Sequence, residues 1–231
     1  MLILKVKGET MKQKINKKDS AEKRAFFGLE FRADETQETE EKGIVDGYAI
    51  IFEKKTDICG MFAEIIRKGA LEKTDLKDVP LLVNHDLNCI PVARSRRNNG
   101  NSTMTLTTDE KGLKIHAELD RKNNPKASEL YSAIKRGDID GMSFMFTVNG
   151  EEWEDESSDY PTRIITGIEK VYEVSAVTFP AYKDTSIDAR AMDIEQAEKI
   201  LEKIKRNGNC EEVNNDERER LKTLIEINAN V

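Results

Sequence analysis

The sequence predicts a mainly β fold with one internal helix and a helical tail. Between residues 25 and 190, short apolar runs are separated by Asn, Gly and charged turn signals, as is typical of antiparallel strands. From residue 190 onward, apolar residues recur at helical spacing instead. We therefore expect a polar N-terminal extension over residues 1–24 that lacks ordered structure, a β domain over residues 25–190 and a helical tail over residues 191–231.

The expected strands follow one another along the β domain. The clearest covers residues 44–52, where Gly47 indicates a bulge or a close backbone contact. Residues 33–42 carry almost no apolar side chain and are expected to be mobile. The remaining expected strands cover residues 25–31, 61–66, 79–85, 91–93, 102–107, 112–119, 141–153, 163–168 and 171–179.

One helix interrupts these strands. Asn124 is a favourable N-cap, Pro125 suits the first helical position, and Gly137 is a natural stop. The side chains between them that form one apolar stripe are Ala127, Leu130, Tyr131 and Ile134. We expect this helix to deliver the chain into the strand that begins at residue 141.

Charge and composition narrow the function classes. The 231-residue chain has a net charge of −7, which disfavours tight nucleic-acid binding, and the basic group Arg94, Arg96 and Arg97 is interpreted as a solvated loop. Three separated cysteines without a CxxC pair argue against a disulfide framework and fit a reducing compartment. No apolar run approaches the length of a membrane span or of a signal peptide, so we expect a soluble, intracellular protein with no membrane contact. The P-loop and dinucleotide motifs are both missing from the sequence, and no cofactor is expected.

Ser143 is the candidate nucleophile. In the run Gly141–Phe146, alternation places Ser143 on one face of a strand, while Met142 and Phe144 lie on the other face. A serine nucleophile needs a base, and the chain contains only two histidines, His85 and His116.

The sequence offers two candidates for the group that orients the base. Glu173 lies in an otherwise apolar strand and shares a face with Ser175, and a carboxylate at such a position needs a partner. Asp86 directly follows His85, but it would point to the opposite face if the strand continued.

Two other kinds of chemistry stay open. A metal site would use His85, Asp86, Cys89 and His116, although structural zinc ligands usually come in closely spaced pairs. Cys89 is a second candidate nucleophile, with His85 four residues before it. A non-enzymatic module that docks through its helical tail is the alternative from another functional class.

Several sequence blocks together resemble the HK97-type phage prohead protease family, the capsid maturation serine peptidases related to the herpesvirus assemblins. The most specific blocks are Asn84-His85-Asp86 and Gly141-Met142-Ser143-Phe144. The others are residues 47–52, 64–71, 109–113, 134–140 and 173–182, in the family order.

The resemblance implies a compact, assemblin-like β-barrel with flanking helices, in which Ser143 is the nucleophile and His85 the base. Glu173 is the best replacement for the third group of the assemblins, which is a histidine, and Arg163 is a candidate near the oxyanion. The expected substrates are the major capsid protein and the scaffold inside the immature prohead, in the cytoplasm of the bacterial host. The resemblance also implies removal of the tail by self-cleavage, and it leaves a homo-oligomer open.

Overall fold

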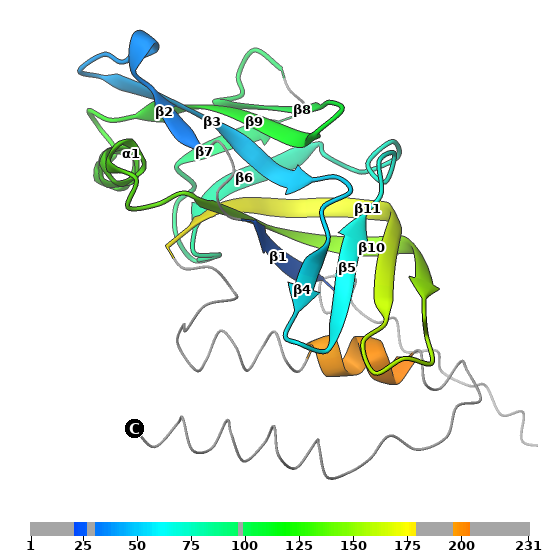
Figure 1. Cartoon of the computed structure of the whole chain (residues 1–231). Helices are drawn as coiled ribbons and strands as arrows, with labels where there is room; N and C mark the ends of the chain where they lie inside the picture. The colour runs from blue at the N-terminus through cyan, green and yellow to red at the C-terminus, as the bar shows by residue number, and fades with distance from the viewer. Residues whose placement is uncertain (1–20, 27–30, 97–98, 179–195, 204–231) are drawn as a thin grey trace, which may run out of the picture.

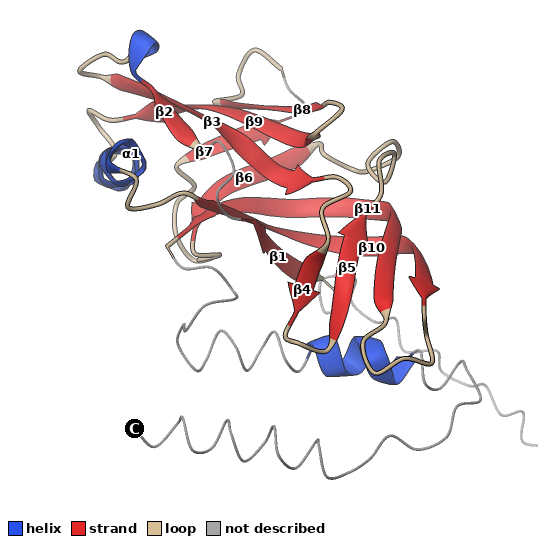
Figure 2. Ribbon diagram, in the orientation of Figure 1, coloured by secondary structure: helices blue, strands red, loops and turns tan. Residues whose placement is uncertain are grey.

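Two β-sheets face each other across a shared apolar core in the computed structural model of the chain (Figure 1). The structure describes residues 21–26, 31–96, 99–178 and 196–203. Strands make up most of the regular structure, as Figure 2 shows, so the predicted mainly β class is confirmed. Among the described residues no helix is both long enough and apolar enough to cross a membrane.

The larger sheet has seven strands and carries the candidate site. Its order is β1 (Glu22–Phe26), β10 (Gly141–Glu154), β11 (Thr162–Val177), β5 (Phe62–Ile66) and β4 (Thr56–Ile58). In addition, β6 (Asp78–Val83) pairs with β11, and β7 (Ala93–Arg96) pairs with β6. The smaller sheet has the order β2 (Arg32–Asp34), β3 (Lys42–Ile51), β9 (Gly112–Asp120) and β8 (Met104–Thr108). No strand pairing joins the two sheets within the described part of the chain, so the closed barrel expected from the resemblance is not found there.

The long strand β11 organises the larger sheet. Along one edge it forms a hairpin with β10, and along the other it pairs in parallel first with β5 and then with β6. The sequence predicts two strands over residues 163–179, whereas the structure has one continuous strand over Thr162–Val177 with register shifts against β10. These shifts let a single strand bend and serve both halves of the sheet.

The core lies between the sheets and is closed at one end by a helix. On β9 the four predicted core residues Leu113, Ile115, Ala117 and Leu119 are fully buried. The helix α1 (Pro125–Arg136) begins and ends at the predicted residues, because Asn124 Oδ1 accepts a hydrogen bond from the Ala127 N–H and Gly137 adopts a left-handed φ of 77°. Its predicted apolar stripe is buried, and the helix contacts β2, β3 and β9 (Figure 1).

A second helix, at residues 196–203, packs on the far end of the larger sheet (Figure 1). Ala197 is fully buried in a small cluster with Ile58 and Phe62, and Trp153 packs against the same cluster. The helix therefore covers β4, β5 and the end of β10. The remainder of the predicted helical tail, from residue 204 onward, lies outside the described residues.

Three local expectations differ from the structure. The strand β1 begins at Glu22, inside the predicted polar extension, and β2 occupies part of the segment 33–42 that was expected to be mobile. Arg94 and Arg96 belong to β7 rather than to a loop, and Arg94 makes a bidentate ion pair with Asp78 on β6 at 2.7 and 2.8 Å. In each case a partner distant in sequence stabilises a segment that looks polar by itself.

Candidate active site

Ser143 lies near the start of β10, on the face of the larger sheet that points away from the smaller sheet. Its register partners are Ala25 on β1 and Ser175 on β11, so the serine sits between two neighbouring strands. The opposite face of β10 is apolar, and Met142, Phe144 and Phe146 are fully buried there. This packing fixes the strand, and the predicted alternation of faces around Ser143 is observed.

His85 reaches Ser143 from a turn that follows β6. The His85 Nε2 atom lies 2.7 Å from Ser143 Oγ, across 58 residues of sequence. The turn contains two consecutive residues with left-handed backbone, Asn84 with φ of 51° and His85 with φ of 58°. This backbone ends the strand and turns the imidazole over β11, toward β10.

Glu173 on β11 completes a chain of three side chains. Its Oε1 atom lies 2.6 Å from His85 Nδ1, and its side chain is only 1% exposed. His85 is also mostly enclosed, with 15% of its side chain exposed. A hydroxyl, an imidazole and a carboxylate in hydrogen-bonding sequence form the arrangement that activates a serine for attack on a carbonyl.

The Ser143 hydroxyl has two hydrogen-bond acceptors within reach. Besides His85 Nε2, the backbone carbonyl oxygen of Arg24 on β1 lies 2.8 Å from Ser143 Oγ. A hydroxyl carries one proton, so it can donate to only one of these acceptors at a time. Attack on a substrate requires the orientation in which Ser143 donates to His85, because the base must receive that proton.

The other histidine lies elsewhere in the fold. His116 is on β9 in the smaller sheet, where its side chain is 47% exposed and its Nδ1 atom lies 3.1 Å from Asp46 Oδ1. His116 therefore faces solvent on the smaller sheet. Of the two histidines, only His85 contacts Ser143.

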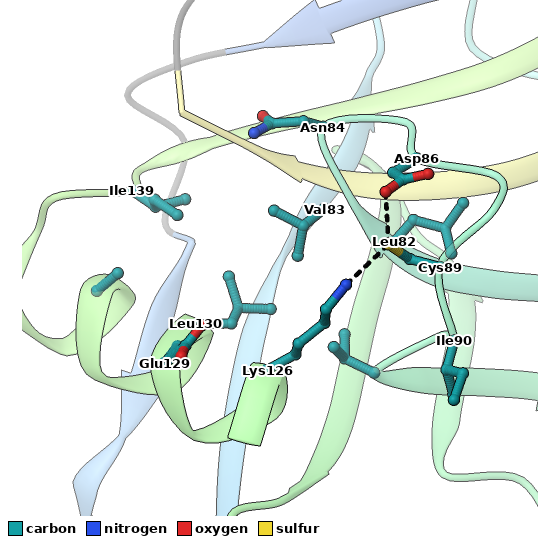
Figure 3. Close-up of a pocket in the computed structure, with 12 residues that line it drawn as sticks. Leu82, Val83, Asn84, Asp86, Cys89, Ile90, Lys126, Glu129, Leu130 and Ile139 are labelled. Carbon is teal, nitrogen blue, oxygen red and sulfur yellow. Dashed lines mark hydrogen bonds between the residues drawn. The ribbon is translucent and has the colours of Figure 1, made fainter. Parts of the chain in front are cut away.

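The residues of the alternative metal and cysteine sites are not brought together around His85. A pocket of about 400 Å³ lies between α1 and the segment that follows β6, and Cys89 and Asp86 line it (Figure 3). The Cys89 thiol contacts the Asp86 carboxylate, and Lys126 Nζ lies 2.8 Å from Cys89 Sγ. Both ring nitrogens of His85 are taken by Ser143 and Glu173, so the imidazole is not directed at Cys89.

Arg163, the residue expected near an oxyanion, lies at the opposite end of β11 from Ser175. It belongs to a buried charge cluster, defined here as Glu22, Arg24, Glu64, Glu151 and Arg163. The Arg163 guanidinium contacts three carboxylates at 2.6 to 2.9 Å, and Lys203 of the second helix binds Glu151 at 2.8 Å. These contacts commit Arg163 to ion pairing within the cluster.

The protonation of the charge cluster follows from its pairing. Burial by itself raises the pKa of Glu22, but the charge of Arg24 and the hydrogen bond from Arg163 outweigh burial and leave that pKa below its usual value. Burial also raises the pKa of Glu151. The charge of Arg163 and the hydrogen bond from Lys203 lower it by more, so the pKa of Glu151 lies below its usual value as well. Glu22 and Glu151 are therefore ionised at neutral pH, and the ion pairs of the cluster link β1, β5, β10 and β11.

Sequence reasoning gave no role to the polar groups that support the three central side chains. Ser175 Oγ donates to Glu173 Oε2 at 2.5 Å and accepts from the His85 backbone N–H at 3.1 Å. Asn84 Oδ1 accepts from the backbone N–H and the hydroxyl of Thr178 at 3.0 and 3.2 Å. Strand alternation places Ser175 on the face of Glu173, which is the one signal in the sequence that points to it.

Comparison with known proteins adds a family. A family model describing the caudovirus prohead serine proteases matches residues 28–200, which is well over half of the chain. The matched range contains Ser143, His85 and Glu173, whereas β1 lies before it. No curated protein and no solved structure matches the chain.

Proposed function

The chain belongs to the caudovirus prohead serine protease family, and on that premise we propose that it is an endopeptidase that uses Ser143, His85 and Glu173 as its catalytic triad. One observation carries the assignment: the unbroken series of contacts from Ser143 Oγ through the His85 ring to the Glu173 carboxylate, at 2.7 and 2.6 Å. Both distances are within hydrogen-bonding range for a nucleophile, a base and an orienting acid.

The proposed reaction proceeds through an acyl-enzyme. Ser143 Oγ attacks the carbonyl carbon of the scissile peptide bond while its proton moves to His85 Nε2. As the tetrahedral intermediate collapses, the C–N bond breaks and His85 passes that proton to the leaving amine. A water molecule then attacks the acyl carbon, giving its proton to His85, and the C–O bond to Ser143 breaks with return of the proton to the serine.

Glu173 has two tasks in this scheme. Its Oε1 atom accepts a hydrogen bond from the Nδ1–H of His85, which leaves Nε2 free to accept the proton of Ser143. The buried carboxylate also stabilises the imidazolium that forms during attack, since a negative charge with little solvent around it acts strongly on a neighbouring cation.

The family membership suggests the substrates. We propose that the enzyme cleaves the major capsid protein and the scaffold protein during maturation of a phage prohead, within the particle and without a cofactor. The tail beyond the β domain is a further proposed substrate, through self-cleavage.

Co-expression with the cognate capsid gene tests the assignment. Ser143→Ala and His85→Ala should both leave the capsid precursor at its full mass, because general base catalysis alone contributes roughly 10²–10⁴ in rate. His116→Ala is the matched control, because this exposed histidine contacts Asp46 and should leave processing unchanged. Intact mass spectrometry of both proteins over time gives the readout, and it also reports any shortening of the protease itself.

Two outcomes would overturn the proposal. Normal processing by Ser143→Ala would remove the serine from the mechanism. A wild-type protein that cleaves nothing, and whose Ser143 never reacts with a serine-directed phosphonate, would instead favour the non-enzymatic assembly module.

A further inference from the structure

Ser175 connects the proposed acid to the backbone that holds the proposed base. Its side chain is fully buried, and its hydroxyl lies between Glu173 Oε2 at 2.5 Å and the His85 backbone N–H at 3.1 Å. A serine hydroxyl has one donor proton and two acceptor lone pairs, so it makes both hydrogen bonds at once. Ser175 therefore contacts two members of the proposed triad while its own side chain is closed off from solvent.

The first contact orients the carboxylate. With Oε2 held by Ser175, the remaining oxygen of Glu173 is directed at His85 Nδ1. Glu173 has no other hydrogen-bond donor among the contacts of the described residues, so without Ser175 one of its oxygens would be buried and unpaired. An unpaired buried oxygen favours a different side-chain rotamer, which would turn the carboxylate away from the imidazole.

The second contact stabilises a strained turn. The left-handed region is unfavourable for residues other than glycine, although Asn adopts it more readily than most, and two such residues follow one another at Asn84 and His85. Three hydrogen-bonding groups of β11 and its end hold this turn: the Ala176 carbonyl binds the Asn84 N–H at 2.9 Å, Thr178 binds the Asn84 side chain, and Ser175 Oγ binds the His85 N–H. Of these three groups, the Ser175 hydroxyl is the one that binds the backbone N–H of His85.

From these contacts we propose that Ser175 is a positioning residue of the protease, one that sets the orientation of Glu173 and the turn of His85 together through a single hydroxyl. The inference rests on the proposed function. It predicts that Ser175 contributes to the rate of acylation and not to substrate binding, because its hydroxyl is enclosed between residues of the enzyme.

Ser175→Ala tests the inference by removing the hydroxyl without adding volume. We expect kcat to fall roughly 10²-fold, the scale associated with a misplacement of about 1 Å in a catalytic group, with KM unchanged. The second-order rate constant for phosphonate labelling of Ser143 should fall by a similar factor. Ser175→Cys retains a weak donor at the same position and should recover part of the loss.

Two further measurements separate positioning from a general loss of stability. Ser95→Ala is the matched control, since Ser95 is also a fully buried serine but lies on β7, and its loss should leave kcat unchanged. In the double variant Ser175→Ala with Glu173→Gln, the two effects should not add, because Ser175 acts largely through Glu173. The low-field proton NMR resonance of His85 Nδ1–H should shift or broaden in Ser175→Ala and stay unchanged in Ser95→Ala.

The outcomes distinguish this inference from the proposed function. If Ser143→Ala is inactive while Ser175→Ala keeps the wild-type kcat and the wild-type His85 resonance, the positioning role is refuted and the triad stands. If the losses in the double variant add fully, Ser175 does not act through Glu173, and the inference is again wrong. Continued processing by Ser143→Ala would refute the proposed function and the positioning role with it.

Discussion

Glu173→Gln is the sharpest test of how the proposed triad works. The substitution keeps the shape of a side chain that is 1% exposed, and it replaces one carboxylate oxygen by an NH₂ group. If the NH₂ group faces His85, the Nδ1 atom must become an acceptor, and Nε2 then carries the ring proton and cannot take the proton of Ser143. If the NH₂ group faces Ser175, the ring tautomer is kept but the negative charge beside the imidazolium is lost.

The expected loss is large in either orientation. Replacing the acid of a serine triad by its amide lowers kcat roughly 10⁴-fold, which corresponds to about 5 kcal/mol of transition-state stabilisation. Stability should change far less, because the side-chain volume is preserved and the hydrogen-bonding positions can be reoccupied. The charge effect is therefore separated from any cavity effect.

The assay is the initial rate of conversion of the purified capsid precursor, followed by mass, with phosphonate labelling of Ser143 as a second measure. Asp86→Asn is the control: this exposed carboxylate contacts Cys89 and the Asn88 N–H, whereas the His85 ring nitrogens contact Ser143 and Glu173, so the rate should stay within about twofold of wild type. A Glu173→Gln protein that keeps more than a tenth of the wild-type rate would refute the argument. A greater loss in Asp86→Asn than in Glu173→Gln would transfer the role to Asp86.

Two further predictions concern the charge cluster. Glu64→Ala removes the carboxylate that both buried guanidinium groups contact and should lower the free energy of unfolding by about 3–5 kcal/mol, measured by urea titration. The control Glu110→Ala removes an exposed surface carboxylate and should lower that free energy far less. Equal losses in the two variants would contradict the prediction. Because the folded-state pKa of Glu22 lies below its usual 4.5, the stability that its ionised form contributes is fully present above pH 4.5 and is lost as the pH falls through the lower folded value. The urea midpoint should therefore decline more steeply on acidification in wild type than in Glu22→Gln, and identical pH profiles would show that this carboxylate is not linked to folding.

The sequence predicted those parts of the fold that are encoded locally. The helix α1 is stabilised by its own caps and a single apolar stripe, so the positions of Asn124, Pro125 and Gly137 were sufficient. The continuity of β11 was not predictable in this way, because the polar pair Glu169-Lys170 reads as a break, and only the parallel partners β5 and β6 show that the strand continues. The strand β1 was missed for a similar reason: the burial of Arg24 makes physical sense only with Glu64, forty residues away.

For the candidate site, residue types were predicted and backbone geometry was not. The sequence pattern offered Ser143 as a nucleophile, Glu173 as an unexplained carboxylate and two histidines as possible bases, and the resemblance to the prohead protease family selected His85. The left-handed turn at Asn84 and His85 has no glycine to mark it in the sequence. Without that turn, the support from Ser175 could not be recognised, because one of its two contacts is with His85, which lies 90 residues earlier in the chain.

The order of the three central residues along the chain also bears on folding. Ser143 and Glu173 lie on the two arms of one hairpin, whereas His85 is separated from Ser143 by 58 residues and from Glu173 by 88. Contacts that close short loops form with a smaller entropy cost than contacts that close long ones. The hairpin of β10 and β11 is therefore favoured to form first, and the parallel docking of β6 brings in the imidazole late. In the folding chain the proposed nucleophile and the proposed acid would then come together before the proposed base joins them, and the three side chains would be assembled only when the pairing of β6 with β11 is complete.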